Sequence, residues 1–144
     1  MTWEKRRVLV VAKAAPESSK AHGDVVCTAG ITDEGEFIRL YPIPLALWKR
    51  GLGFKKYDWI EVECEKAEEL RNRKESYRIR EGSEIRTVGS IPVEKARGKS
   101  NWDRRNEVIL RGTSPSMEDL VSRAERDGTS LGLVKVDELL EFYK

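Results

Sequence analysis

Short apolar runs that alternate with polar residues mark out the first third of the chain. Residues 6–14 form a Val-rich run that is typical of a buried strand. Residues 24–31 and 36–44 are two further strand-like runs, and the four residues between them, 32–35, include Asp and Gly. This spacing predicts a β-hairpin. The prolines that close the second run lack an amide donor, so we expect strand pairing to end there.

The same alternation continues over residues 54–67. Its apolar face carries Ile60, Val62 and Cys64, and its opposite face carries Tyr57, Trp59, Glu61 and Glu63. Residues 76–80 and 84–93 predict two more strands, which the turn at 81–83 joins. A final strand is expected at residues 129–136.

Helical signals are concentrated in the last third of the chain. Ser114 is the expected N-cap of the main helix, Pro115 fits its first helical position, and Gly128 fits its C-terminal stop. We expect a second, short helix over residues 137–144 and partly helical structure over residues 94–112.

The order of these elements decides between fold classes. The predicted strands follow one another in hairpins and do not alternate with helices, so a doubly wound sheet is not expected. A closed sheet has no exposed edges, which favours a barrel. We therefore predict a mainly β (α+β) fold, a small, largely antiparallel β-barrel with one or two flanking helices.

Charge is unevenly distributed, although the formal net charge of the 144 residues is only +2. Residues 71–111 contain 12 Lys and Arg against 6 Asp and Glu, a net charge of +6, while residues 1–70 carry −1 and residues 112–144 carry −3. A segregated basic block suits a polyanion. The alternative is the solvated surface of a protein from a thermophile, because the chain has 36% charged residues, no Gln and three Asn.

The sequence implies no cofactor and no metal. A structural zinc site needs about four ligands, and the chain has one histidine, His22, and two distant cysteines, Cys27 and Cys64. We interpret both thiols as small buried hydrophobes, with a disulfide left open. The N-terminus shows neither a signal sequence nor a membrane span, so a cytoplasmic protein is expected.

The second run of the hairpin has two unlike faces. Ile38 and Leu40 are aliphatic and resemble core, whereas Phe37, Arg39 and Tyr41 alternate with them and share the other face. Exposed rings and cations on a sheet bind single-stranded nucleic acid, the rings stacking on bases and the cations contacting phosphates. The alternative is that these rings are part of the packing and the Arg is merely solvated.

Aromatic and cationic residues interleave well beyond this run. The proposed phosphate contacts are Arg39, Lys55, Lys56, Arg78 and Arg80, and the proposed stacking residues are Tyr41, Trp48 and Tyr57. As an alternative, the arginines of the 76–80 strand pair with Glu61 and Glu63 on a neighbouring strand. Trp102, beside Arg104 and Arg105, is either a further clamp or a packing residue, and packing is favoured.

Two rival functions remain. A protein partner or a second copy could dock through the amphipathic helix over residues 115–127. Alternatively, acids near Asp24 and Asp58 could bind a metal in a small nuclease or nucleotide hydrolase.

Four segments together resemble a known group of small prokaryotic domains. They read VVCTAGITDEGEFIRLYPIP, FKKYDWIEVE, ESYRI and TSLGLVKVDELLEF. The group comprises OB-like β-barrels, including the dual OB-containing type, and the matching positions are Cys27, Gly30, Phe37, Arg39, Tyr41, Pro42, Trp59 and Ser130 to Gly132. The resemblance implies one OB-like barrel domain over residues 1–144, with a C-terminal helical segment over about 112–144. It also implies nucleic-acid binding, by analogy of fold.

Overall fold

The structure is a computed structural model of the chain. It describes residues 2–14, 17–20, 23–45, 53–67, 73–96, 99–138 and 140–141. Within these residues no helix is long and apolar enough to cross a membrane.

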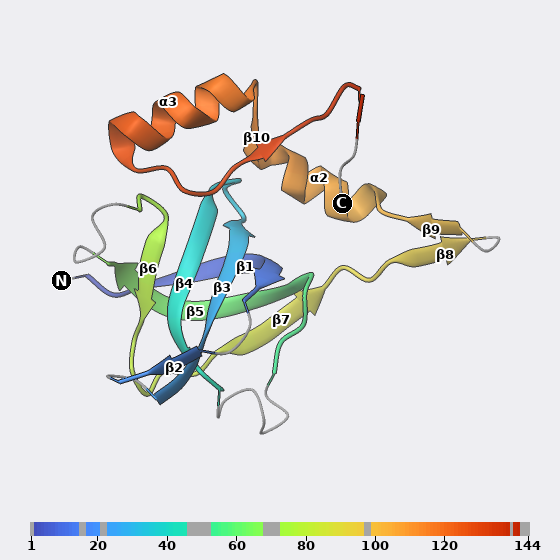
Figure 1. Ribbon diagram of the computed structural model, residues 1–144. Coiled ribbons are helices and arrows are strands. Elements are labelled where there is room, and N and C mark those ends of the chain that lie inside the picture. The colour runs from blue at the N-terminus through green and yellow to red at the C-terminus, as the bar shows by residue number, and fades with distance from the viewer. Residues whose placement is uncertain are drawn as a thin grey trace.

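Five strands close into a small mixed β-barrel (Figure 1). They are β1 (Glu4–Lys13), β3 (Gly23–Thr32), β4 (Phe37–Pro44), β5 (Asp58–Lys66) and β6 (Ser76–Ile79). Their order is β1-β3-β4-β6-β5, and β1 also pairs with β5, which closes the ring. β4 and β6 are parallel, whereas the other barrel pairs are antiparallel. The predicted fold class is confirmed.

Two more strands extend the barrel sheet. The outer strand β7 (Arg86–Ser90) pairs with the first half of β5, and β2 (Glu17–Ser19) pairs with the start of β3. The predicted hairpin is β3 and β4. Its pairing runs past Pro42, through a register shift between Val26 and Thr28, and ends at Pro44, which lies opposite Val25.

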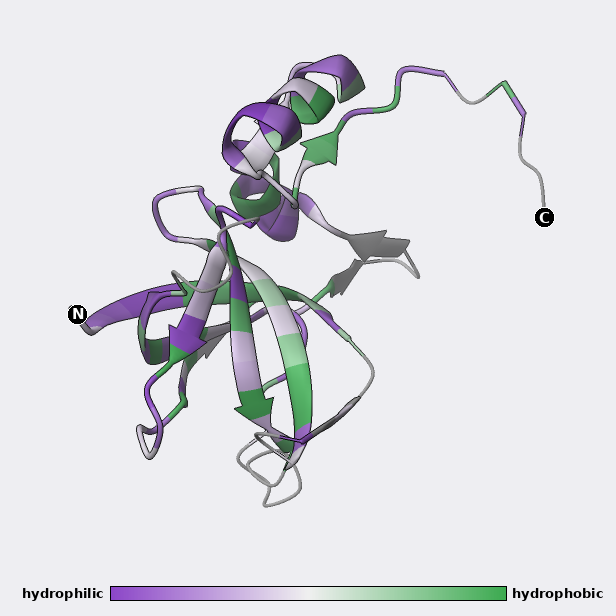
Figure 2. Ribbon diagram, turned by 60° about the vertical axis from the view of Figure 1, so that its left-hand side comes forward, coloured by the Kyte–Doolittle hydropathy of each residue, from purple (hydrophilic) through white to green (hydrophobic). Residues whose placement is uncertain are grey.

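The barrel interior is filled by the inward side of each alternating strand. Ile38, Leu40, Ile60 and Val62 are almost completely buried, as their alternation predicts. The full interior cluster is Val8, Val10, Ile38, Leu40, Ile43, Phe54, Ile60, Val62, Cys64 and Ile79. Hydrophobic and hydrophilic residues alternate along the barrel strands (Figure 2).

A second apolar cluster lies outside the barrel. Leu9 and Ile31 point outward from β1 and β3 and pack against Val108 of helix α2 (Asp103–Ile109). Burying these side chains fixes the helix on the barrel wall.

The C-terminal elements form a separate layer on one end of the barrel (Figure 1). They are η3 (Leu110–Gly112), β10 (Thr113–Ser114), α3 (Met117–Asp127) and β11 (Leu133–Val134). Between β7 and α2, the short strands β8 (Glu94–Ala96) and β9 (Lys99–Asn101) pair only with each other among the described strands.

The expected start of α3 is wrong: the helix begins at Met117, so Pro115 is not its first residue. The N-cap of α3 is Ser116, whose Oγ accepts the N–H of Asp119 at 3.0 Å, and not Ser114. A cap must accept from the first turn, and Ser114 Oγ instead donates to the Asp119 carboxylate. Gly128 does end the helix, with φ +74°.

The expected strand at 129–136 is only the two-residue β11, which pairs in parallel with β10 and not with the barrel. Of the helix expected at 137–144, the described residues 137, 138, 140 and 141 are not helical, and the other four lie outside the described residues. Neither segment buries a continuous apolar face against the barrel: Val136 and Leu140 are 70% and 81% exposed.

Gly30 allows β1 and β3 to approach each other closely. A Cβ atom at this position would lie 2.3 Å from Val8 Cγ1 and 2.5 Å from the carbonyl oxygen of Leu9. We therefore expect Gly30→Ala to lower the free energy of unfolding by about 1–3 kcal/mol through overpacking. Urea denaturation measures this change. Gly89→Ala is the matched control, because its Cβ would meet only Trp59, at an ordinary 3.7 Å, and an equal loss in the two variants would contradict the explanation.

Candidate nucleic-acid interface

The outer face of β3 and β4 carries the side chains that the alternation assigns to it. Ile38 and Leu40 point into the barrel, whereas Phe37, Arg39 and Tyr41 are half-buried on the outside. Arg39 lies opposite Ala29 in the neighbouring strand. The predicted sidedness of β4 is confirmed.

Arg39 occupies the middle of this face and has only weak acceptors. Its Nη1 lies 3.9 Å from Cys27 Sγ, and its Nη2 lies 3.4 Å from Ser130 Oγ. Its Nε is buried and has no hydrogen-bond partner among the described residues, none of whose carboxylates pairs with the guanidinium. A buried donor without an acceptor costs about 1–3 kcal/mol. Arg39 is thus a fixed cation whose hydrogen-bonding capacity is largely unused.

Phe37 is covered by the C-terminal layer. Gly112 approaches the ring so closely that a Cβ there would lie 2.6 Å from Phe37 Cε2. Phe37 is therefore a packing residue, as in the alternative interpretation. Arg39 and Tyr41 remain the candidate binding residues of this face. Tyr41 precedes a cis peptide bond to Pro42.

Lys55 and Lys56 are exposed in the connection that leads into β5. The backbone N–H of Lys55 donates to Asp58 Oδ2 at 2.8 Å. Burial lowers the pKa of nearby Lys13, and repulsion from Lys56 adds to this effect, while Asp58 opposes it. These charges make that end of the barrel locally positive. Trp48, the third proposed stacking residue, lies outside the described residues.

Tyr57 is already stacked within the protein. The guanidinium of Arg105 lies 3.8 Å from the centre of its ring, and Trp102 meets the ring edge-on at 5.2 Å. Arg105 Nε also donates to the carbonyl of Ile91 at 2.8 Å. One face of the Tyr57 ring is therefore occupied, and Trp102 and Arg105 act as packing residues.

The arginines of β6 and its surroundings form a ladder of ion pairs with β5. Arg78 pairs with Glu65, Arg80 lies 3.0 Å from Glu63, and Arg86 lies 3.2 Å from Glu61; these are the ladder's three rungs. The ladder is the alternative that the sequence left open for Arg78 and Arg80. The role of Arg78 and Arg80 in binding stays a prediction, but each of their charges is already paired with a glutamate of β5.

The acids considered for a metal site bond to their own neighbours. Asp24 accepts the hydroxyl of Ser18 at 2.9 Å, and Asp58 accepts the Lys55 amide. In the part of the chain that the structure describes, no three His, Cys, Asp or Glu residues form a group that could hold a metal ion.

Glu75 fastens the C-terminal layer to the barrel next to Arg39. Glu75 is 7% exposed, and its carboxylate accepts the backbone N–H groups of Ser130 at 2.8 Å and Leu131 at 3.0 Å. It also accepts the Ser130 hydroxyl at 2.8 Å. Through its backbone, Glu75 accepts the N–H of Arg39 at 2.8 Å. We call this set the Glu75 clasp.

Lys74 adds a second attachment beside the clasp. Its N–H donates to the Gly128 carbonyl at 3.1 Å, and its Nζ lies 3.1 Å from Asp127 Oδ2. Hydrogen bonds from Thr129, and then from Lys74, lower the pKa of the Asp127 carboxyl to about 2. Any stability from this group is thus present above its unfolded pKa of about 3.9 and is lost as the pH falls through 2.

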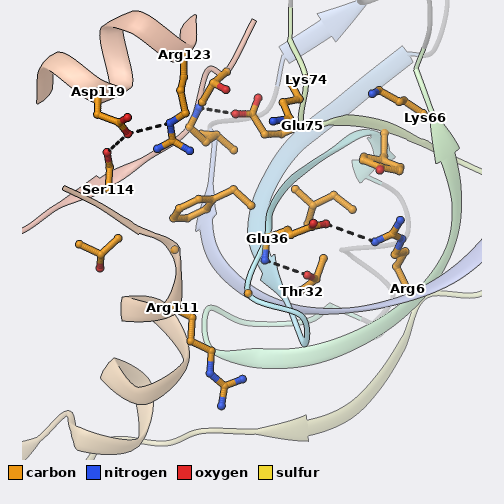
Figure 3. Close-up of a pocket in the computed structure, with 18 of the residues that line it drawn as sticks. Arg6, Thr32, Glu36, Lys66, Lys74, Glu75, Arg111, Ser114, Asp119 and Arg123 are labelled. Atoms are coloured by element: carbon orange, nitrogen blue, oxygen red, sulfur yellow. Dashed lines mark hydrogen bonds and ion pairs between the residues drawn. The ribbon is translucent and has the colours of Figure 1, made fainter. Parts of the chain in front are cut away.

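A cleft of about 540 Å³ lies between the end of the barrel and the C-terminal layer (Figure 3). Its cations are Arg6, Lys66, Lys74, Arg111 and Arg123. Three of them already have acid partners, which are Glu4 and Glu36 for Arg6, Asp127 for Lys74, and Asp119 for Arg123. In Figure 3 the Arg111 side chain points away from the other cations. The cleft therefore offers less free positive charge than its composition suggests.

Sequence reasoning missed Glu75, Cys27 and Ser130 as neighbours of Arg39. Glu75 stands in a charged loop with no periodic signal, and its partner Ser130 is 55 residues further along. The only available signal was the SLG segment, Ser130 to Gly132, within the resemblance. Cys27 is half-buried on the outer face, not buried as expected.

Comparison with known proteins gives a family match that covers the barrel. Residues 4–111 match the family described as "Domain of unknown function (DUF8758)". A search among curated proteins found no match. The match ends within η3, so the rest of the C-terminal layer lies outside it.

The two cysteines differ in environment, and this generates a prediction about the outer face. Burial raises the pKa of the Cys64 thiol to about 12, and its side chain lies in the barrel core. We expect N-ethylmaleimide to modify Cys27 in the folded protein and Cys64 only after unfolding, because the thiolate is the nucleophile. Mass spectrometry of digested protein measures both sites. Rapid modification of Cys64 under native conditions would contradict the closed barrel.

Proposed function

The chain belongs to the DUF8758 family, and we propose that it is a nucleic-acid-binding module that holds single-stranded DNA or RNA without catalysing a reaction. The proposed site is the outer face of β3 and β4, with Arg39 and Tyr41 at its centre. One observation carries the proposal. Arg39 is held on this face with no carboxylate partner among the described residues.

The topology supports this choice of face. Five strands closed by pairing of the first with the fourth, with the third parallel to the fifth, have the arrangement of OB-fold barrels. OB-folds bind oligonucleotides on the face of their second and third strands, which here are β3 and β4. Because a fold does not fix a function, the chemistry of Arg39 is the stronger support.

Arg39 is suited to a phosphate. Its donors meet a thiol and a hydroxyl, both weak partners, and a phosphate oxygen would supply a charged acceptor. Beside it, the half-buried ring of Tyr41 is the proposed base-stacking residue, since stacking contributes roughly 1–3 kcal/mol per base. Lys55 and Lys56, both exposed, are proposed to contact further phosphates. Tyr57 contributes less, since Arg105 covers one face of its ring.

The double variant Arg39→Ala/Tyr41→Ala tests the proposal. We expect it to raise the Kd for a labelled single strand of about 15 nucleotides at least tenfold, because one phosphate contact and one stacking surface are lost. The slope of log K against log salt should become shallower by about 0.7. Fluorescence anisotropy measures both, and urea denaturation checks that the variant still folds.

Arg86→Ala is the matched control, because it also removes one arginine, but one that is paired with Glu61 and is not a predicted phosphate contact. An unchanged Kd in the folded double variant, or an equal loss in Arg86→Ala, would remove the proposed face. In the wild type, binding of an oligonucleotide should also protect Cys27, which lies beside Arg39, from N-ethylmaleimide.

The wild type should first be compared on single-stranded RNA, single-stranded DNA and duplex DNA. Binding to none of them would favour the rival function as an accessory subunit. The exposed side chains of Met117 and Val121, at 59% and 54% exposure one turn apart on α3, favour that rival. A dimer in light scattering would then be its expected signature.

A further inference from the structure

The C-terminal layer reaches the proposed site at Ser130. This residue is exposed and lies 3.4 Å from Arg39 through its hydroxyl oxygen. It lies outside the residues that match the family. The Glu75 clasp attaches the segment around Ser130 to the barrel just before β6. The close-up shows Glu75 bonded to that segment (Figure 3).

The hydroxyl of Ser130 has a defined direction. A serine hydroxyl has one hydrogen and two lone pairs. Its hydrogen is donated to Glu75 Oε2 at 2.8 Å, so only lone pairs remain for Arg39 Nη2. Because an ionised carboxylate accepts but does not donate, this polarity cannot be reversed while Glu75 is charged.

The same residue acts on Arg39 from a second direction. The backbone carbonyl of Glu75 accepts the Arg39 backbone N–H, which ties β4 to the start of β6. Glu75 therefore positions the backbone of Arg39, and Ser130 orients its guanidinium group. On its remaining side, Nη1 makes a long hydrogen bond to Cys27 Sγ.

We propose that Ser130 and Glu75 are positioning residues for Arg39, so that the C-terminal layer forms part of the nucleic-acid site. This inference rests on the proposed function. Arg39 remains the residue that contacts the phosphate, and the Ser130 hydroxyl holds the guanidinium in one orientation. Preorganising a long side chain in this way removes an entropy cost that binding would otherwise incur.

The experiment is a double-mutant cycle on the full chain. Ser130→Ala keeps both backbone N–H groups that Glu75 accepts, so the layer should stay docked and the urea unfolding curve should change little. We expect the Kd for the labelled single strand to rise about three- to tenfold, as for the loss of one hydrogen bond of typical strength. In the Arg39→Ala background, the same substitution should have no further effect on Kd.

Two variants separate positioning from a general structural role. Ser130→Thr retains the hydroxyl and should restore most of the affinity. Ser122→Ala removes an exposed serine from α3, in the same layer, and should leave the Kd unchanged. Glu75→Gln keeps the size of the side chain but removes its charge, and we expect it to weaken both layer docking and binding.

The outcomes distinguish the inference from the function it rests on. If Arg39→Ala weakens binding but Ser130→Ala does not, the positioning role is wrong and the proposed function stands. If Arg39→Ala leaves the Kd unchanged, the proposed function falls. If the effects of Ser130→Ala and Arg39→Ala simply add, the serine contacts the nucleic acid independently, and the positioning role is again wrong.

Discussion

The pairing of β1 with both β3 and β5 is the constraint on which the rest of the structure depends. It closes the sheet, so every strand in the ring has one side turned to a common interior and one turned out. The interior takes the aliphatic side chains, and the strict period of two then assigns every alternate residue to the surface. Gly30 is what allows β1 and β3 to come close enough for this closure. The outward positions of Arg39 and Tyr41 are consequences of that geometry.

The register of neighbouring strands determines which outward-facing cations lie beside an acidic residue. The arginines at 78, 80 and 86 each fall opposite or beside a glutamate of β5, and their charge is neutralised within the sheet. Arg39 falls opposite Ala29, which has no charge to offer. Arg39 therefore differs from the three arginines that pair with β5 in what it can bind. A count of basic residues, such as the excess over 71–111, does not reveal this difference.

Much of the barrel could be predicted from the sequence, because alternation is a local signal. It identified the hairpin of β3 and β4, the inward side of β5 and the outward side of β4. Part of what failed depended on partners distant in sequence, as where Gly112 covers Phe37. The N-cap of α3 is a local error: Ser116 caps the helix, and the Ser114 hydroxyl donates to the Asp119 carboxylate instead. The environment of Arg39 was equally hidden, since Glu75 meets Ser130 only through the fold.

The Glu75 clasp has a consequence for how sequences beyond the barrel can vary. Two of its hydrogen bonds come from main-chain amides, which every residue except proline possesses. A single glutamate on the barrel can therefore hold C-terminal segments of different sequence, provided that each places two successive backbone N–H groups within hydrogen-bonding distance of the carboxylate. Such an attachment depends mainly on the backbone of the appended segment, whereas the closure of β1 on β3 depends on the identity of one residue, Gly30.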